Sequence, residues 1–527
     1  MSAYELCFFS SLHPSSVVIS SPHFLRTAYA PQLGARLNIS HTKLNVIGSA
    51  GNFGVYGTSA IWGRVIDARG PRIPFTSAFF LLLIGYSGIR LLYEHGLTHN
   101  ENTLPSFTFL LLVACSLITG VGASAGGGSA INSTAKTFPD SARATAVGLV
   151  LSGFGLSAFL FSTVSRVLFP GNTSDFLLIL ALGTALPMIL GFFFVRPIPL
   201  PHSGQQRGTS TSTSLDDGRR TSISDAERLM GPRAPLLQHG SLHPTVFDVE
   251  DEESEEGVDE RIPTSTSSTS RFLSRRRALL MGDASLTNMF GTGLFKSSDF
   301  WLLFVIMSLL SGTGVVYINN VGSMSQVLYA KQNAKYDDIE ASKWQTTQVS
   351  VISVMSCAGR IIIGLICDYG KRRFDIPRSA SLILVSSLFF ISQVAAANIG
   401  NIHNLWIPSA ILGLANGSMF TLFATMCSVW FGMPHFAENY GYLQIAPIFA
   451  GNLFSVIFGR NLDAHDTGSS PHILGPPRCS LGKECYVATL YLTMGACFLG
   501  IVLSAWACSR DREKLRKATA MAGSGES

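Results

Sequence analysis

Long apolar segments recur along this chain at a spacing typical of membrane-spanning helices. About 20 apolar residues are needed to cross a hydrocarbon layer of about 30 Å. Runs that reach or approach this length occupy residues 43–63, 74–93, 106–131, 145–167, 175–195, 300–322, 344–366, 379–397, 405–430, 437–459 and 486–508. The buried helices of a soluble protein do not supply so many runs of this length. The pattern therefore predicts an all-α polytopic membrane protein.

The start of the chain does not follow this pattern cleanly. Residues 4–25 are apolar in patches, but His13, Pro14, Pro22 and His23 interrupt them. A cleavable signal peptide is not indicated, because a basic first region is missing. Two interpretations stay open. Either the segment is an atypical first span that brings the total to twelve, or the chain does not begin at the residue from which this fold normally starts.

The composition changes completely between residues 197 and 299. Serine and threonine tracts and an acidic block from Asp248 to Glu260 leave no apolar period there. Such a segment buries too little apolar surface to offset its ordering entropy, so it predicts a disordered linker. We interpret the acidic block as a solvated spacer. The alternative is a regulatory segment whose charge changes when nearby serines are phosphorylated.

These boundaries predict two six-helix bundles joined by a linker. The expected parts are an amino-terminal segment with a degenerate first span (1–42), an amino-terminal bundle (43–196), a linker (197–299), a carboxyl-terminal bundle (300–509) and a tail (510–527). Lys and Arg are concentrated in the loops that follow the spans ending near 63, 366 and 508. Because basic loops stay in the cytosol, we expect these loops, the linker and both termini to be cytosolic if the first span exists.

Composition narrows the class of function. The chain is 47% hydrophobic and only 13% charged, whereas soluble domains have about 25% charged residues. The sequence contains no P-loop, no cluster of metal ligands and no nucleophile with a matching base. We therefore expect neither an enzyme nor an ATP-driven pump, and no cofactor or nucleic-acid partner. The expected partners are the lipid bilayer and a small-molecule solute.

The same charged motif occurs twice, once in each predicted bundle. Its first copy runs from Gly63 to Arg72 and its second from Gly364 to Arg373, and each lies between two apolar spans. Glycine permits a close approach of a neighbouring helix, and aspartate can pair with cations or cap a helix. We predict a latch for alternating access, with a simple basic anchor as the alternative. The predicted gating residues are Gly63, Arg64, Asp67, Arg69, Arg72, Gly364, Asp368, Lys371 and Arg372.

These two hairpins resemble the loop signature of the major facilitator superfamily. Further segments are similar to its fungal monocarboxylate-transporter-homologue branch, close to plant nodulin-like carriers: Tyr29–Leu33, Gly70–Pro71, Phe138–Asp140, Glu438–Tyr442 and Gly459–Asp463. The resemblance implies a twelve-helix carrier of the major facilitator fold. It also implies the vacuolar membrane as the location, with the plasma membrane as the alternative.

Arg360 lies inside the span 344–366, and an arginine at membrane depth marks a candidate functional site. Its surroundings are similar to the eighth helix of monocarboxylate transporters, where an arginine binds the substrate carboxylate. In those carriers an aspartate one turn earlier takes part in proton coupling, but Ser356 stands here. This difference counts against proton-linked transport. Pairing of Arg360 with the hairpin charges across the bundle is the alternative to solute binding.

Amides at membrane depth are the other candidate binding groups. Asn320, Asn416 and Gln444 need polar partners, so we expect them to line a wet cavity, with contacts between helices as the alternative. In the loop before the last span, Cys479 and Cys485 are predicted to form a disulfide on the non-cytosolic side. Asn38 and Asn172 begin glycosylation sequons expected on the same side.

The sequence as a whole predicts a monomeric secondary transporter. It is expected to move a small polar or anionic solute, which could be a monocarboxylate, by alternating access between its halves. A receptor or scaffold that keeps the carrier fold without transporting is one alternative. A truncated, inactive product is another, because the first span is atypical.

Overall fold

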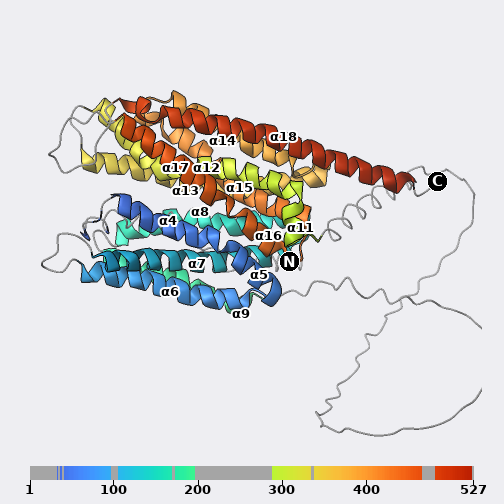
Figure 1. Ribbon diagram of the computed structural model, residues 1–527, viewed down its shortest axis with the longest axis horizontal. Helices are drawn as coiled ribbons and strands as arrows, with labels where there is room; N and C mark the ends of the chain where they lie inside the picture. The colour runs from blue at the N-terminus through green and yellow to red at the C-terminus, as the bar shows by residue number, and fades with distance from the viewer. Residues whose placement is uncertain are drawn as a thin grey trace, which may run out of the picture. The chain divides into compact units, whose positions relative to one another are not determined.

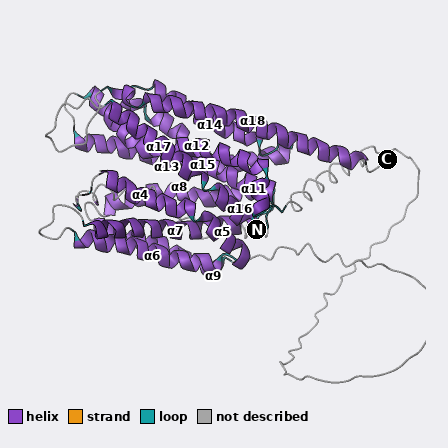
Figure 2. Cartoon of the chain, in the orientation of Figure 1, coloured by secondary structure: helices purple, strands orange, loops and turns teal. Residues whose placement is uncertain are grey.

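The computed structural model describes residues 41–96, 105–168, 173–195, 288–333, 337–465 and 481–524, together with Leu33, Arg36, Leu37 and Ile39. Within these residues the chain is helical, with turns between the helices and no strand (Figure 2). The expected first span at 4–25 and residues 197–287 of the expected linker lie outside the described residues.

The amino-terminal bundle follows the predicted spans closely. Its helices are α4 (His41–Gly57), α5 (Ser59–Arg69), α6 (Arg72–His95), α7 (Ser106–Thr137), α8 (Arg143–Leu168) and α9 (Thr173–Phe194). The expected span 43–63 is divided between α4 and α5, with the break at Thr58. Apolar side chains on facing helices, such as Phe75, Leu82 and Phe176, form the buried core of this bundle.

The carboxyl-terminal bundle contains the six predicted spans from 300–322 to 486–508, one more than the amino-terminal bundle, together with short elements. It contains α11 (Thr292–Lys296), α12 (Ser298–Gln332), α13 (Asp338–Phe374), α14 (Ala380–Asn398), η1 (Ile402–Asn404), α15 (Trp406–Phe431), α16 (Phe436–Leu443), α17 (Ala446–Ala464), η2 (Gly482–Cys485) and α18 (Val487–Ser524). Gln444 and Ile445 separate α16 from α17, and Pro447 explains the break, because proline has no N–H for the helix ladder.

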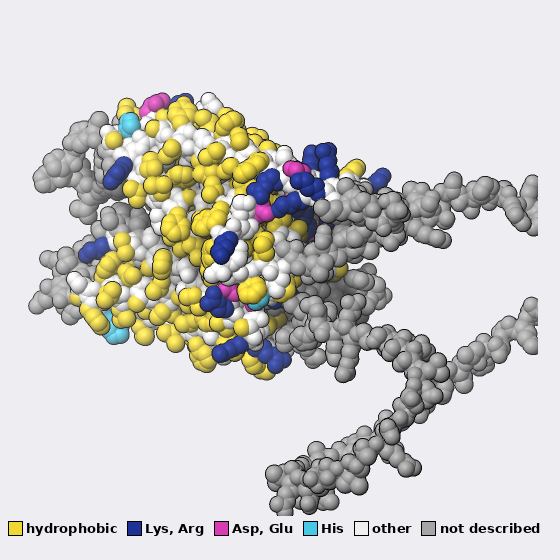
Figure 3. Space-filling view, turned by 45° about the vertical axis from the view of Figure 1, so that its right-hand side comes forward, with side chains coloured by type: hydrophobic (Ala, Val, Ile, Leu, Met, Phe, Trp, Pro, Cys, Tyr) yellow, Lys and Arg dark blue, Asp and Glu magenta, His cyan; other side chains and the backbone are white. Residues whose placement is uncertain are grey.

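Ten of the described helical segments are long and apolar enough to cross a membrane. Their outward surfaces carry large apolar side chains, including Phe107, Phe193 and Phe498, which are more than half exposed. Figure 3 shows such side chains covering the face in view, with Lys and Arg gathered toward one end. An apolar belt of this kind is what lipid requires, so the protein is a multi-pass membrane protein.

Two predicted boundaries are corrected by the structure. The expected linker 197–299 ends too late, because residues 288–297 pack on the carboxyl-terminal bundle. Leu294 is fully buried there, and the Asn439 amide donates to the Met289 carbonyl at 2.8 Å. The expected tail 510–527 is not separate, because α18 continues to Ser524 and Arg510 pairs with Asp299 at 2.8 Å. Apolar content marks where a helix leaves the bilayer but not where it ends.

The two bundles meet mainly through two pairs of helices, with smaller contacts of α8 with α15, of α7 with α16 and of α4 with α17 (Figure 1). Helix α5 packs on α16, and α8 packs on α13. The α5–α16 contact lies near the end of the molecule that carries the loops of the two charged hairpins, 70–71 and 375–379, which we call the hairpin end. The α8–α13 contact begins there, at Thr145 and Asp368, and continues along both helices to Gly155 and Cys357. Close packing at this end positions the site described next.

Candidate functional site

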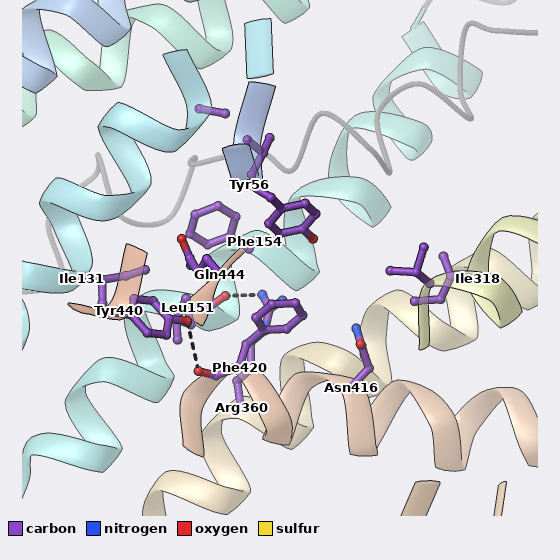
Figure 4. A pocket seen from close by; sticks show the side chains of 13 residues that line it. Tyr56, Ile131, Leu151, Phe154, Ile318, Arg360, Asn416, Phe420, Tyr440 and Gln444 are labelled. Atoms are coloured by element: carbon purple, nitrogen blue, oxygen red, sulfur yellow. Dashed lines mark hydrogen bonds between the residues drawn. The ribbon is translucent and has the colours of Figure 1, made fainter. Parts of the chain in front are cut away.

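A central pocket lies between the bundles, next to these helix pairs (Figure 4). It encloses about 800 Å³, including the part that is open to solvent. The amino-terminal bundle contributes Val55, Tyr56, Ala123, Ile131, Leu151 and Phe154 to its lining, and the carboxyl-terminal bundle contributes Val315, Ile318, Arg360, Asn416, Phe420, Tyr440 and Gln444. A largely apolar pocket with a few polar groups is the usual form of a small-molecule site.

Arg360 is the one charged residue of this lining, and it is only 6% exposed. One guanidinium nitrogen donates to the carbonyl oxygen of Leu151, while Nε has no hydrogen-bond partner in the described part of the chain. The guanidinium carbon lies 5.9 Å and 6.0 Å from the ring centres of Phe154 and Phe420. Aromatic faces attract a cation but do not neutralise it. The pocket therefore holds a buried positive charge with donor capacity to spare.

Neither hairpin charges nor any other carboxylate pairs with Arg360 among the described residues. The alternative role, pairing across the bundle with the hairpins, is therefore wrong for the part of the chain that the structure describes. The reason is geometric. Arg360 lies two helical turns before Asp368 on α13, and Asp368 is occupied by other partners at the hairpin end.

The three amides expected in a cavity behave differently. Asn416 and Gln444 line the pocket with Arg360. Asn320 does not line it, because its amide donates to the carbonyl of Val316 in the preceding turn, at 2.7 Å. Helix α12 is apolar nearly all round, so its sequence does not indicate which face meets the pocket.

Tyr56 and Tyr440 also line the pocket, and the sequence prediction missed both. Tyr56 comes from the last turn of α4, and Tyr440 from α16. Tyr440 lies within the quoted motif Glu438–Tyr442, which was the available signal for it. Tyr56 had no such signal, since a single tyrosine in an apolar span is most often a packing residue.

At the hairpin end, the first charged motif forms the α5–α16 clasp, defined by Arg64, Asp67, Lys136 and Glu438. Asp67 accepts from Lys136 Nζ at 2.8 Å and from the backbone N–H of Glu438, at the start of α16, at 2.9 Å. Arg64 Nη2 lies 2.7 Å from Glu438 Oε1. A carboxylate at a helix N-terminus satisfies free N–H groups and the helix dipole. Asp67 thus ties one bundle to the other.

The second motif forms the α8–α13 clasp, defined by Asp140, Thr145, Asp368, Lys371 and Arg378. Asp368 accepts from the backbone N–H and the hydroxyl of Thr145, in the first turn of α8, at 2.8 Å each. Arg378 donates to Asp368 at 3.1 Å and to Asp140 at 2.8 Å. Lys371 also pairs with Asp140. Both repeated aspartates therefore bind the start of a helix in the opposite bundle.

The repeated glycines make these contacts possible. A Cβ on Gly63 would lie 2.8 Å from Glu438 Cα, and one on Gly364 would lie 2.8 Å from Thr145 Cα. Both distances are shorter than side-chain atoms tolerate. Each glycine thus lets its helix approach the start of the opposing helix closely enough for the aspartate one turn later to reach the backbone N–H.

Asp140 lies in the turn between α7 and α8 and holds the second clasp together. Burial opposes its ionisation, but Arg378 and Lys371, with Arg143, outweigh burial and keep the pKa of this carboxyl well below its usual range. Asp140 therefore stays charged at any physiological pH. Its bonds to Arg378 and Lys371 do not respond to ordinary changes of pH.

Not every predicted gating residue joins a clasp. Arg372 donates only to the carbonyl of Asp368, in its own helix, at 3.3 Å. Arg69 and Arg72 are exposed, and they form no ion pair with any described residue. These two arginines fit the basic anchor that was the alternative, since cations at a helix end face the headgroups.

Lys136, Asp140, Thr145, Arg378 and Glu438 are the clasp residues that the prediction left out. Asp140 and Glu438 were present in the quoted motifs, but their contact with the hairpins could not be inferred.

The predicted disulfide and glycosylation sites lie partly or wholly outside the described residues. Cys485 is disulfide-bonded and buried, while Cys479 lies outside the described residues, so the pairing stays a prediction. Asn38 and Asn172 also lie outside them, and nothing tests their glycosylation.

Known proteins resemble the chain along most of its length. A family model described as Major Facilitator Superfamily matches residues 22–451. The chain is 25% identical over 524 residues to the uncharacterized membrane protein YMR155W of Saccharomyces cerevisiae, covering 89% of this chain and 88% of that protein. It is 22% identical over 529 residues to the probable transporter MCH1 of Gibberella zeae, covering 91% and 85%.

Among solved structures, a double tryptophan mutant of XylE has a similar fold. The TM-score is 0.57 at 12% sequence identity, and the match covers 96% of this chain and 99% of that one. At this identity the likeness establishes the helical architecture alone.

Proposed function

The chain belongs to the major facilitator superfamily and is a membrane transporter, and we propose that its solute is a small organic anion with an apolar body. The family and the transport activity expected from the sequence are thereby confirmed. The solute class, the direction and the location are proposals. A monocarboxylate such as benzoate has the chemistry that the central pocket would accept.

The observation that carries the proposal is the environment of Arg360. A buried guanidinium without a carboxylate partner is costly unless a ligand neutralises it. Its Nε has no partner among the described residues, and Arg360 is part of the pocket wall. Asn416 and Gln444 add amides beside it. One carboxylate would therefore neutralise the buried guanidinium of Arg360.

The rest of the lining supports a solute that is not polar throughout. Ile131, Leu151, Phe154, Ile318 and Phe420 give the pocket an apolar wall. A sugar or a dicarboxylate would bury hydroxyl or charged groups against this wall without partners. An anion with one carboxylate and an aliphatic or aromatic body would place its charge on Arg360 and its carbon atoms on the wall.

Alternating access follows from the position of the clasps. With the hairpins on the cytosolic side, the two clasps close that side while the pocket lies between the bundles. Release of the solute to the cytosol then requires separation of α5 from α16, of α8 from α13, or of both. The ion pairs and helix caps of the clasps would break and form again during each cycle.

The location and assembly are also part of the proposal. The resemblance to the fungal branch favours the vacuolar membrane, with the plasma membrane as the alternative. We expect a monomer, because the pocket and both clasps are built within one chain. The protein would act as a carrier without an enzymatic reaction of its own.

Substitution of Arg360 tests the proposal directly. The purified protein is reconstituted into vesicles, and uptake of radiolabelled benzoate, pyruvate and the neutral analogue benzamide is measured. We expect benzoate or pyruvate to be taken up and benzamide to be excluded. Arg360→Ala should reduce uptake at least 30-fold, since hydrogen bonds to charged groups contribute about 1.5–3 kcal/mol each. Arg360→Lys should retain part of the activity.

Arg516→Ala is the matched control, because Arg516 is exposed on the last turns of α18, away from the pocket. It should transport as the unaltered protein does. Equal uptake of benzoate by Arg360→Ala would remove Arg360 from the site. Uptake of benzamide but of neither acid would refute the proposed solute class.

A further inference from the structure

Among the buried charged residues that the structure describes, Arg360 is the one without an opposite charge beside it. Asp368 and Arg378 are both buried and pair with each other at 3.1 Å. Glu438 is buried too, and it pairs with Arg64 at 2.7 Å. Arg360 receives a backbone carbonyl and two aromatic faces instead. Its positive charge is therefore balanced only when a bound solute brings a negative one.

The place of Arg360 in the fold prevents a hairpin acid from supplying that charge. Its guanidinium donates to the Leu151 carbonyl of α8, and a Cβ on Gly148 of α8 would collide with the Arg360 carbonyl oxygen, so the two helices are in backbone contact here. Asp368 lies eight residues further along α13. That spacing is about 12 Å along the axis, beyond the three or four residues at which side chains of one helix meet. An intact α13 keeps this separation however the bundles are turned.

The lining of the central pocket offers no substitute for a carboxylate. Its other titratable groups are the phenols of Tyr56 and Tyr440, and phenols ordinarily ionise only near pH 10. Asn416 and Gln444 are neutral amides. Gain or loss of a proton by this lining therefore does not balance the charge of Arg360 at neutral pH.

The missing charge matters most when the pocket is closed on both sides, as it must be between its two open states. With a carboxylate bound, the pocket then encloses an ion pair. Without one, it encloses a lone guanidinium between apolar side chains such as Leu151, Phe154 and Phe420. A lone charge in apolar surroundings is far more costly than a paired one. The bundles therefore meet a higher barrier when they turn without solute.

We propose that the protein is an anion exchanger, which carries one monocarboxylate in each direction and returns without solute only slowly. The gradients of the two anions set the direction of such an exchange, and a complete cycle moves no net charge. The inference rests on the proposed function, since it assigns a mode of transport to the anion that Arg360 binds.

Efflux of a labelled anion tests the mode of transport. Vesicles containing the reconstituted protein are loaded with radiolabelled pyruvate at pH 8, where almost none of this acid is protonated and able to cross lipid. They are diluted into unlabelled pyruvate or into gluconate, whose hydroxyl groups the apolar wall leaves without partners. Valinomycin and equal potassium on both sides hold the membrane potential at zero, so that charge build-up slows neither flux.

We expect efflux into pyruvate to be at least about 30-fold faster than efflux into gluconate, a difference of about 2 kcal/mol between the two barriers. Equal efflux into both media would overturn the exchange and leave the solute class intact. Efflux no faster than from protein-free vesicles in either medium would overturn both proposals.

Ser356 allows a test of the cause. It lies one turn before Arg360 on α13, is fully buried, and its hydroxyl has no hydrogen-bond partner among the described residues. Side chains four residues apart on a helix are neighbours, so Ser356→Asp places a carboxylate within reach of Arg360. Ser356→Asn has nearly the same shape without the charge and is the matched control.

We expect the ratio of the two efflux rates to fall below about threefold in Ser356→Asp and to stay at about 30-fold or more in Ser356→Asn, because only the first variant pairs Arg360 when no solute is bound. The ratio compares two fluxes through the same protein, so partial loss of folded carrier does not affect it. A ratio that Ser356→Asp leaves unchanged would overturn the unpaired charge of Arg360 as the cause of the slow return.

Discussion

Arg360 and Asp368 stand two turns apart on α13, yet their surroundings give them opposite roles. Asp368 is fully buried and accepts from Thr145 and Arg378, so its charge is satisfied within the protein. Arg360 is nearly as buried but receives no carboxylate from the described residues. A buried charge that has partners within the protein stabilises the structure. A buried charge without such partners is retained where a ligand supplies the opposite charge.

Asp140 offers a test of the clasps at the level of one residue. Because its folded-state pKa is held well below the usual range, its contribution to stability is present above the unfolded pKa of about 3.9 and is lost as pH falls through the lower folded value. We expect Asp140→Asn to destabilise the protein by about 3 kcal/mol at pH 7. The deficit should persist down to pH 5 and shrink below pH 4.

Melting temperatures in detergent measure this effect across the pH range. Glu484→Gln is the control, because Glu484 is exposed in η2 at the opposite end of the molecule. It should change the melting temperature little at any pH. A deficit for Asp140→Asn that disappears already between pH 7 and 5 would contradict the assignment of Asp140 as a permanently charged centre.

At the scale of helices, the two clasps repeat one arrangement. In each, a glycine on one helix admits the first turn of a helix from the other bundle, and an aspartate one turn later accepts from its backbone N–H. The flanking charges differ, since Glu438 joins only the first clasp and Asp140 only the second. The shared part is therefore the helix cap, and the ion pairs are additions to it.

Replacing either glycine should loosen its clasp. A Cβ on Gly364 would also lie 2.6 Å from the Ala144 carbonyl oxygen, so Gly364→Val must push α13 away from α8. Gly63→Val must likewise separate α5 from α16. We expect backbone amides of residues 143–148 in the first variant, and 436–441 in the second, to exchange hydrogen at least tenfold faster. Mass spectrometry of the corresponding peptides measures this.

Gly370→Val serves as the matched control, because nothing lies within 4 Å of a Cβ at that position on α13. It should leave the exchange of both peptides unchanged. If Gly364→Val and Gly370→Val behave alike, the close approach at Gly364 does not hold the clasp.

The helices themselves were predictable from the sequence, because lipid demands apolar surface over a fixed length. The repeated glycine and aspartate also predicted a charged latch, but not which helices it joins. Their partners could not be predicted, since Asp67 and Glu438 are 371 positions apart and only the folded bundles bring them together. Asn320 was assigned wrongly to the pocket, because its own helix satisfies its amide.

At the scale of the whole molecule, the pocket and the clasps use the same helices. Helix α13 carries Arg360 and Asp368, and α16 carries Tyr440 and Glu438. A solute that binds Arg360 and touches Tyr440 therefore acts on the helices whose starts or ends form the clasps. We therefore expect occupancy of the pocket to affect the contact between the bundles. The sequence predicted the two bundles and Arg360, but not that the helices of the pocket also form the clasps.

We expect an anion bound to Arg360 to shift the clasps toward separation of the bundles. The distance between spin labels, introduced as unnatural amino acids at the exposed Arg69 and Arg373, measures this shift in the reconstituted protein. Benzoate should add a longer distance to the distribution in the otherwise unaltered protein and none in Arg360→Ala. A distribution that benzoate leaves unchanged, or changes equally in Arg360→Ala, would show that an anion on Arg360 does not act on the clasps.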